Sequence, residues 1–133
     1  MAYVDGRIDD ALTLWRAGRR EGAFLLAIVA LVARARQDFS KPMGEGESFR
    51  RYIQSCFAPR LSVEYRGEQW PIEDVFYKWF RCEIVHAGGL PVDIAFMDDA
   101  EPGTLSVRAG GAPNYLLLIS TGWFDQLLSW ARA

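Results

Sequence analysis

Apolar side chains recur at helical spacing along the first part of the chain. Ile8, Leu12 and Trp15 repeat at intervals of three or four residues and predict a helix over residues 7–18. Residues 21–39 follow the same spacing and are apolar on most sides, a pattern typical of a helix at the centre of a bundle or inside a dimer interface. The chain is therefore predicted to open with a pair of helices.

Two more helices are predicted in the middle of the chain, after a break rich in proline and glycine. One runs from Glu47 or Ser48 to Pro59, and the other covers residues 72–87. The second has an apolar face at helical spacing and is followed by two glycines, which suit the left-handed residue that often ends a helix. This helix therefore ends within one turn of His86, the single histidine of the chain.

Three further segments carry strand-like patterns. Residues 61–71 predict a short extended stretch and a turn, and residues 92–109 alternate on either side of an acidic turn and predict a β-hairpin. Residues 115–120 are interpreted either as a third strand or as an apolar lead into a C-terminal amphipathic helix around Trp123 and Trp130. The predicted fold is mostly α, with four to five helices and a small late β-hairpin.

Length and composition indicate a single domain over residues 1–133. Half of the residues are hydrophobic and 14% are aromatic, which is ample for a packed core. The net charge of −2 gives no global attraction to phosphate backbones, so RNA binding would need a local basic patch. The arginines of the first half are interpreted as a solvated face or as such a patch: Arg16, Arg19, Arg20, Arg34, Arg36, Arg50, Arg51 and Arg60.

The cysteines and the single histidine argue against a zinc site. Cys56 and Cys82 have no metal ligand at short spacing, so neither a metal nor another cofactor is predicted. The chain shows no secretory signal, which favours reduced thiols. Its most apolar run, residues 23–33, is too short to span a bilayer. We expect a cytoplasmic protein with no membrane partner.

The candidate chemistry lies at the end of the helix predicted over residues 72–87. Motifs for phosphate-binding loops, serine hydrolases and zinc proteases are absent from the sequence. Arg81 and His86 remain. A histidine can move a proton at neutral pH, and an arginine can clamp a phosphate and stabilise developing charge. Together they could cleave RNA without a metal, with the histidine taking the proton of the ribose 2′-hydroxyl.

The same two residues also have a purely structural interpretation. A histidine in the last turn is favoured by the helix dipole, and an arginine there can bond the free carbonyls of the helix end. On an ideal helix, five residues separate two side chains by about 140°, so Arg81 and His86 do not share a face. They meet only if the helix loosens before Gly88, or if both line a groove formed with another chain.

The segment FYKWFRCEIVHAGG, residues 76–89, resembles the signature helix of the HEPN superfamily (higher eukaryotes and prokaryotes nucleotide-binding domain). The motif of that family is an arginine, four to six residues, and a histidine. Arg81 and His86 match its short form, and the aromatic run before the arginine also fits. Residues 7–90 resemble the helical order of the family, whereas the part after Pro91 looks like a lineage-specific addition.

The resemblance implies an antiparallel helical bundle that forms a homodimer, with both motifs facing a shared cleft. Members of the family are metal-independent endoribonucleases of toxin or defence systems, some with an antitoxin-like protein partner, or non-catalytic binding modules. The residue after the arginine is commonly polar and helps to position the site, but here it is Cys82, whose thiol is a weak hydrogen-bonding group. Tyr77, Cys82 and Glu83 are candidate supporting residues. Alternatively, Cys82 only packs in the core, and Glu83 only faces solvent.

Three functions stay open at this point. The first is a homodimeric HEPN-type ribonuclease, in which Arg81 clamps the phosphate and His86 is the general base or acid. The second is a non-catalytic HEPN-like module that dimerises and binds RNA, a nucleotide or a partner protein, which Cys82 and the acidic net charge favour. The third is a structural or interaction domain without a nucleic-acid partner.

Overall fold

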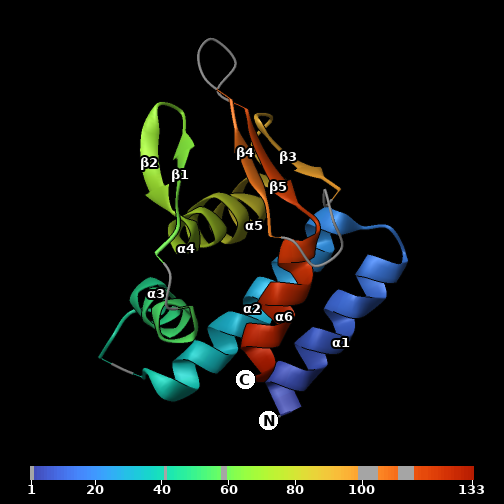
Figure 1. Ribbon diagram of the computed structural model, residues 1–133. Helices are drawn as coiled ribbons and strands as arrows, with labels where there is room; N and C mark the ends of the chain where they lie inside the picture. The colour runs from blue at the N-terminus through green and yellow to red at the C-terminus, as the bar shows by residue number, and fades with distance from the viewer. Residues whose placement is uncertain (1, 41, 58–59, 99–104, 111–115) are drawn as a thin grey trace.

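The structure is a computed structural model that describes residues 2–40, 42–57, 60–98, 105–110 and 116–133 (Figure 1). Most of the described chain is helical, as the sequence predicts. The helices are α1 (Ala2–Arg16), α2 (Arg20–Asp38), α3 (Glu45–Cys56), α4 (Ile72–Asp74), the π-helical segment η1 (Val75–Cys82), α5 (Glu83–Ala87) and α6 (Gly122–Arg132). Not one of the described helices is both long and apolar enough to cross a membrane.

The helix boundaries agree closely with the prediction in the middle of the chain and less well at its start. α1 begins at Ala2 instead of residue 7, because Val4 extends the buried face of the helix one turn before Ile8. α3 begins at Glu45, slightly before the predicted start. α4, η1 and α5 follow one another without a break over residues 72–87, which is the span predicted for one helix.

Helix α2 lies at the centre of the fold. Figure 1 shows α1 and α6 running beside it, with α3 near its C-terminal end. Its sequence is rich in alanine and leucine, which form helices readily and allow close packing on several sides. The residues that it buries are Ala23, Phe24, Ala27, Ile28, Ala30, Leu31 and Ala35.

The C-terminal helix α6 belongs to this core and is not a layer outside it. Trp123 and Phe124 are fully buried. The ring of Phe124 stacks on Trp15 of α1, with centroids 4.3 Å apart and planes within 5° of parallel. The hydroxyl of Tyr52 in α3 donates a hydrogen bond of 2.7 Å to the carbonyl of Trp130. The segment after Pro91, interpreted from sequence as an addition to a helical core, therefore supplies part of the core itself.

A short hairpin joins α3 to the helical stretch at residues 72–87. Strands β1 (Ser62–Tyr65) and β2 (Glu68–Pro71) pair antiparallel, with Arg66 and Gly67 in the turn. Both turn residues have positive φ, 53° and 78°, as a type I′ turn requires. This confirms the extended stretch and turn predicted for residues 61–71.

The β-hairpin predicted over residues 92–109 is wrong in its pairing. Strands β3 (Ile94–Met97) and β4 (Val107–Ala109) do form there, but both pair with β5 (Leu117–Ser120). β5 is the central strand, parallel to β3 and antiparallel to β4. Leu117 and Ile119 are fully buried, and an apolar strand of this kind suits the position that is paired on both edges. The turn predicted between β3 and β4 lies outside the described residues.

Candidate functional site

The motif residues lie on the helical stretch formed by α4, η1 and α5. Its apolar face, which includes Phe76 and Phe80, is buried, and this fixes the helix on α2. The middle of the stretch has π-helical hydrogen bonding, which is rare and is often found at functional sites. The helix ends at Gly88, whose φ of 87° is left-handed and whose N–H donates to the carbonyl of Ile84. The predicted glycine cap is confirmed.

Arg81 is turned toward α3 and is held there by a carboxylate. Its Nη2 atom lies 3.0 Å from Oε1 of Glu45, in the first turn of α3. The side chain of Arg81 is 26% exposed and that of Glu45 is 37% exposed. The contact is an ion pair without hydrogen-bond geometry, since the buried Oε1 atom has no hydrogen-bond partner among the described residues. Sequence reasoning missed Glu45, because no local pattern connects it to a residue so far along the chain.

Tyr77 packs into the same corner between α3 and η1. Its ring lies 5.5 Å from that of Phe49, centroid to centroid. Burial raises the pKa of the Tyr77 phenol, and the nearby carboxylate of Glu45 raises it further. A Cβ on Gly46 would come within 3.0 Å of the Tyr77 ring, so the glycine permits this close approach of the two helices. Tyr77, a candidate supporting residue, does lie beside Arg81 and its partner.

His86 lies in different surroundings from Arg81. It is exposed in the last turn of α5, and its side chain has no hydrogen bond or ion pair with any described residue. The π-helical segment ends at Cys82, so the helix is not loosened between Cys82 and Gly88. No hydrogen bond or ion pair joins Arg81 and His86 in the described part of the chain. The two other candidate supporting residues, Cys82 and Glu83, are half-buried, and Cys82 is a free thiol.

A second cluster surrounds Trp79 on the side of the helix that faces the β1–β2 hairpin. The guanidinium of Arg66 lies 4.8 Å from the Trp79 ring, and the ammonium of Lys78 lies 5.1 Å from it. Arg66 also forms hydrogen bonds of 2.9 and 3.2 Å with both carboxylate oxygens of Asp93. Tyr65 donates a further hydrogen bond to Asp93 at 2.6 Å. These contacts fasten the hairpin to the motif helix and to the segment before β3.

Much of the arginine patch seen in the sequence is used for internal contacts. Arg36 donates to the carbonyl of Met43 and to the hydroxyl of Ser48. Three more arginines of the patch form ion pairs with nearby carboxylates: Arg34 with Asp38, Arg50 with Asp74, and Arg51 with Glu47. The cations that stay exposed beside one another are Arg16, Arg19 and Arg20, at the turn between α1 and α2.

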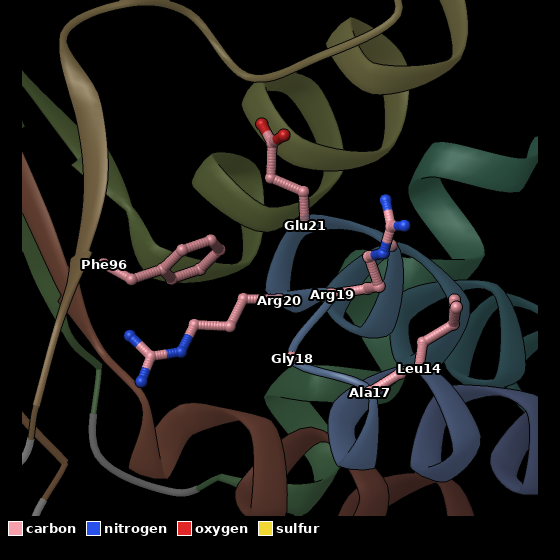
Figure 2. A pocket seen from close by; sticks show the side chains of 8 residues that line it. Leu14, Ala17, Gly18, Arg19, Arg20, Glu21 and Phe96 are labelled. Atoms are coloured by element: carbon pink, nitrogen blue, oxygen red, sulfur yellow. The ribbon is translucent and has the colours of Figure 1, made fainter.

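A groove of about 750 Å³ opens at this turn (Figure 2). It separates the α1–α2 turn from Phe96 of β3, and α2 begins there without a side-chain cap. Its lining residues are Leu14, Ala17, Gly18, Arg19, Arg20, Glu21, Gly22 and Phe96. The sequence showed the two arginines only as part of a possible basic patch. It gave no signal that Phe96 would face them, because that depends on how β3 packs.

Comparisons with protein-family models, with curated proteins and with solved structures found no match to this chain. The resemblance to the HEPN superfamily therefore stays a prediction based on the motif and the helical order. The homodimer, the RNA substrate and the antitoxin-like partner that it implies also stay predictions.

Proposed function

We propose that this protein is a HEPN-like, metal-independent endoribonuclease that acts as a homodimer. The observation that carries the proposal is the state of His86, whose imidazole is exposed and has no hydrogen-bonding or ionic partner among the described residues. It stands at the end of a helix that is anchored in the core over most of its length. A general base needs both properties, because it must be free to take a proton and held where the substrate binds.

A second chain is needed because, within one chain, Arg81 is paired with Glu45 while the exposed His86 has no partner among the described residues. Exposed apolar side chains flank His86 in the sequence: Val85, directly before it, is 53% exposed, and Val92, in the segment after α5, is 102% exposed. Contact between two copies of this surface about a twofold axis would remove both valines from water and place two motifs beside one cleft. Each active site would then combine groups from both chains.

Arg81 can serve as the phosphate clamp because its present partner is weakly held. An ion pair at this degree of exposure is worth about 0–1 kcal/mol, and the Arg81–Glu45 contact lacks hydrogen-bond geometry. A phosphate accepts two parallel hydrogen bonds from a guanidinium, which makes a stronger contact. A bound phosphodiester would therefore displace Glu45 from Arg81.

The reaction follows from these assignments. His86 removes the proton of a ribose 2′-hydroxyl, and the 2′-oxygen forms a bond to the adjacent phosphorus. The bond from phosphorus to the 5′-oxygen breaks, and the protonated His86 of the second chain supplies the proton for that leaving oxygen. The products are a 2′,3′-cyclic phosphate and a free 5′-hydroxyl. Arg81 stabilises the negative charge that builds on the phosphoryl oxygens.

The test is cleavage of labelled cellular RNA in EDTA by the wild type, Arg81→Ala and His86→Ala. General acid–base catalysis contributes about 100- to 10,000-fold, so His86→Ala should lower the rate by at least about 100-fold. Arg51→Ala is the matched control, because this arginine pairs with Glu47 on the surface of α3. Circular dichroism melting curves check that all four proteins fold. Cleavage by His86→Ala at the wild-type rate would remove His86 from the mechanism.

The homodimer is tested separately, by light scattering after gel filtration. The wild type should elute as a dimer, and Val85→Asp combined with Val92→Asp should shift it toward the monomer and reduce cleavage in parallel. A wild type that stays monomeric at high concentration would contradict the shared cleft.

Two observations favour a second candidate, a non-catalytic HEPN-like module that binds RNA. Glu45 neutralises Arg81, and Cys82 stands where the family commonly has a polar residue. RNA binding by the wild type without cleavage of any RNA tested would support this candidate over the ribonuclease.

A further inference from the structure

The groove at the α1–α2 turn combines unused positive charge with apolar surface. The side chain of Arg19 has no hydrogen bond or ion pair with any described residue. Arg20 has one partner, Asp98, at 3.3 Å, and the Asp98 side chain is 86% exposed. A pair that is so exposed to solvent is weak, so Arg20 can exchange Asp98 for a stronger anion. Two guanidinium groups are thus available at one groove.

The carboxylate that lines the groove is already engaged. Oε1 of Glu21 accepts a hydrogen bond of 2.8 Å from the backbone N–H of Leu90, in the turn that follows α5. Figure 2 shows the Glu21 side chain directed away from that of Arg20. This contact takes up part of the negative charge of Glu21. It also places one side of the groove next to the end of the motif helix, a few residues after His86.

The arrangement of the lining side chains suits an extended ligand better than a compact one. Figure 2 shows Arg20 beside Phe96 on one side of the groove, and Arg19 near Leu14 on the other. A single phosphate would engage one of these cations. Successive phosphates of a single strand could engage both, while a base packs on the half-buried ring of Phe96. The volume of about 750 Å³ lies in the range of ordinary ligand sites.

We propose that this groove binds the phosphodiester backbone of single-stranded RNA, with Arg19 and Arg20 at successive phosphates and a base against Phe96. The inference rests on the proposed function for the identity of the ligand, and it adds the path that the strand follows beside His86. The strand would pass from the motif at the end of α5, past the Glu21–Leu90 contact, to the α1–α2 turn. RNA bound there is held by charge and stacking, so binding is sensitive to salt and tolerant of sequence.

The test is binding of a fluorescent 2′-O-methyl RNA octamer, measured by anisotropy at several salt concentrations. This probe lacks the 2′-hydroxyl that attacks the phosphorus, so the wild type cannot cleave it by the proposed route. Arg19→Ala combined with Arg20→Ala should weaken binding at least tenfold. Each phosphate contact on a single strand contributes about 0.7 to the slope of log affinity against log salt, so the double variant should lose about 1.4 from that slope. Both residues are exposed, so the variant should melt as the wild type does.

Arg51→Ala is the matched control, because it removes one exposed cation on α3 and leaves the groove intact. An affinity and salt slope of the double variant equal to those of this control would overturn the inference. A second arm uses adenosine monophosphate as competitor. Weak competition, at a far higher concentration than an unlabelled octamer requires, supports a strand site. Competition by the mononucleotide as strong as that by the octamer would overturn the strand path in favour of a free nucleotide.

The two proposals can fail independently. Loss of octamer binding in the double variant, with no RNA cleavage by the wild type, would keep the groove and reject the ribonuclease. Cleavage that depends on His86, with octamer binding unchanged in the double variant, would keep the ribonuclease and reject the groove.

Discussion

Arg81 and His86 belong to one helical stretch but to two different surroundings. Arg81 is surrounded by groups of its own chain: Glu45 supplies a countercharge, and Tyr77 fills the corner between α3 and η1. At the other end of the stretch, Val85 next to His86 and Val92 in the segment that follows are exposed to water, and the imidazole has no partner among the described residues. Two residues of one sequence motif can therefore differ: one already has a partner within the chain, whereas the other is free to contact a ligand or a second chain.

The largest expected difference between these two parts of the helix is in stability. Phe80 is fully buried among the rings of Phe24, Phe76 and Phe96, with centroids 5.4–6.1 Å away. Phe80→Ala should lower the free energy of unfolding by about 3–5 kcal/mol, from lost burial and the cavity left behind. Urea unfolding followed by circular dichroism measures it.

The control is Val85→Ala, at a side chain that is 53% exposed on the open end of the same helix. It should change the free energy of unfolding by no more than about 0.5 kcal/mol in the monomer. Similar losses in the two variants would contradict the division of the helix into an anchored part and an open end.

The same division explains which features the sequence could predict. The helix over residues 72–87, its apolar face and its glycine cap follow from spacing and residue type, which are local properties. The Arg81–Glu45 pair, the π-helical segment and the groove beside Phe96 depend on how distant elements pack. No local pattern carries that information.

The strands illustrate the limit in another way. Alternation with a period of two marked residues 92–109 as extended, and β3 and β4 are both strands. Alternation does not identify the partner of a strand, however, and both strands pair with β5. The apolar run at residues 115–120 contained a hint, because a strand that is buried on both faces is more uniformly apolar than one with a face in water, and β5 is mostly buried. In the same way, the amphipathic pattern of α6 predicted a helix but not its place in the core.

A smaller effect is expected at the contact between α3 and η1. Gly46→Ala brings a Cβ to 3.0 Å from the Tyr77 ring, which is itself packed on Phe49. We expect a loss of about 1–2 kcal/mol in the free energy of unfolding, despite the better helix propensity of alanine. Gly6→Ala in α1 is the control, since nothing lies within 4 Å of the new Cβ, and it should stabilise by up to about 1 kcal/mol. Stabilisation by both substitutions would show that the corner around Arg81 is loosely packed.

The folded protein should also lose stability at alkaline pH, because the phenols of Tyr52 and Tyr77 have raised pKa values. Burial raises the pKa of Tyr77, and burial, with a smaller effect of the neighbouring Cys56 thiol, raises the pKa of Tyr52 to about 12. Both phenols stay protonated to a higher pH in the folded chain than in the unfolded one, where they titrate near pH 10. Their contribution is fully present below pH 10 and is lost as the pH rises through their folded values. Unfolding in urea between pH 8 and 11.5 measures it, and Tyr77→Phe should flatten the decline. An unchanged decline in this variant would contradict the burial of its phenol.

The smallest effect on stability, and the sharpest test of the comparison, is expected from Glu45→Gln. A pair as exposed as Arg81–Glu45 contributes about 0–1 kcal/mol, so the free energy of unfolding should hardly change. The affinity of Arg81 for a phosphate should change more. Its charge is no longer neutralised, and a bound phosphate has no carboxylate to displace. We expect several-fold tighter binding of the uncleavable RNA octamer, with the increase lost when Arg81→Ala is added. Glu47→Gln is the matched control, as Glu47 lies in the same turn of α3 and pairs with Arg51 at 3.5 Å. Equal tightening by both glutamine variants would reflect net charge alone, and then Arg81 would be no nearer to the RNA than Arg51.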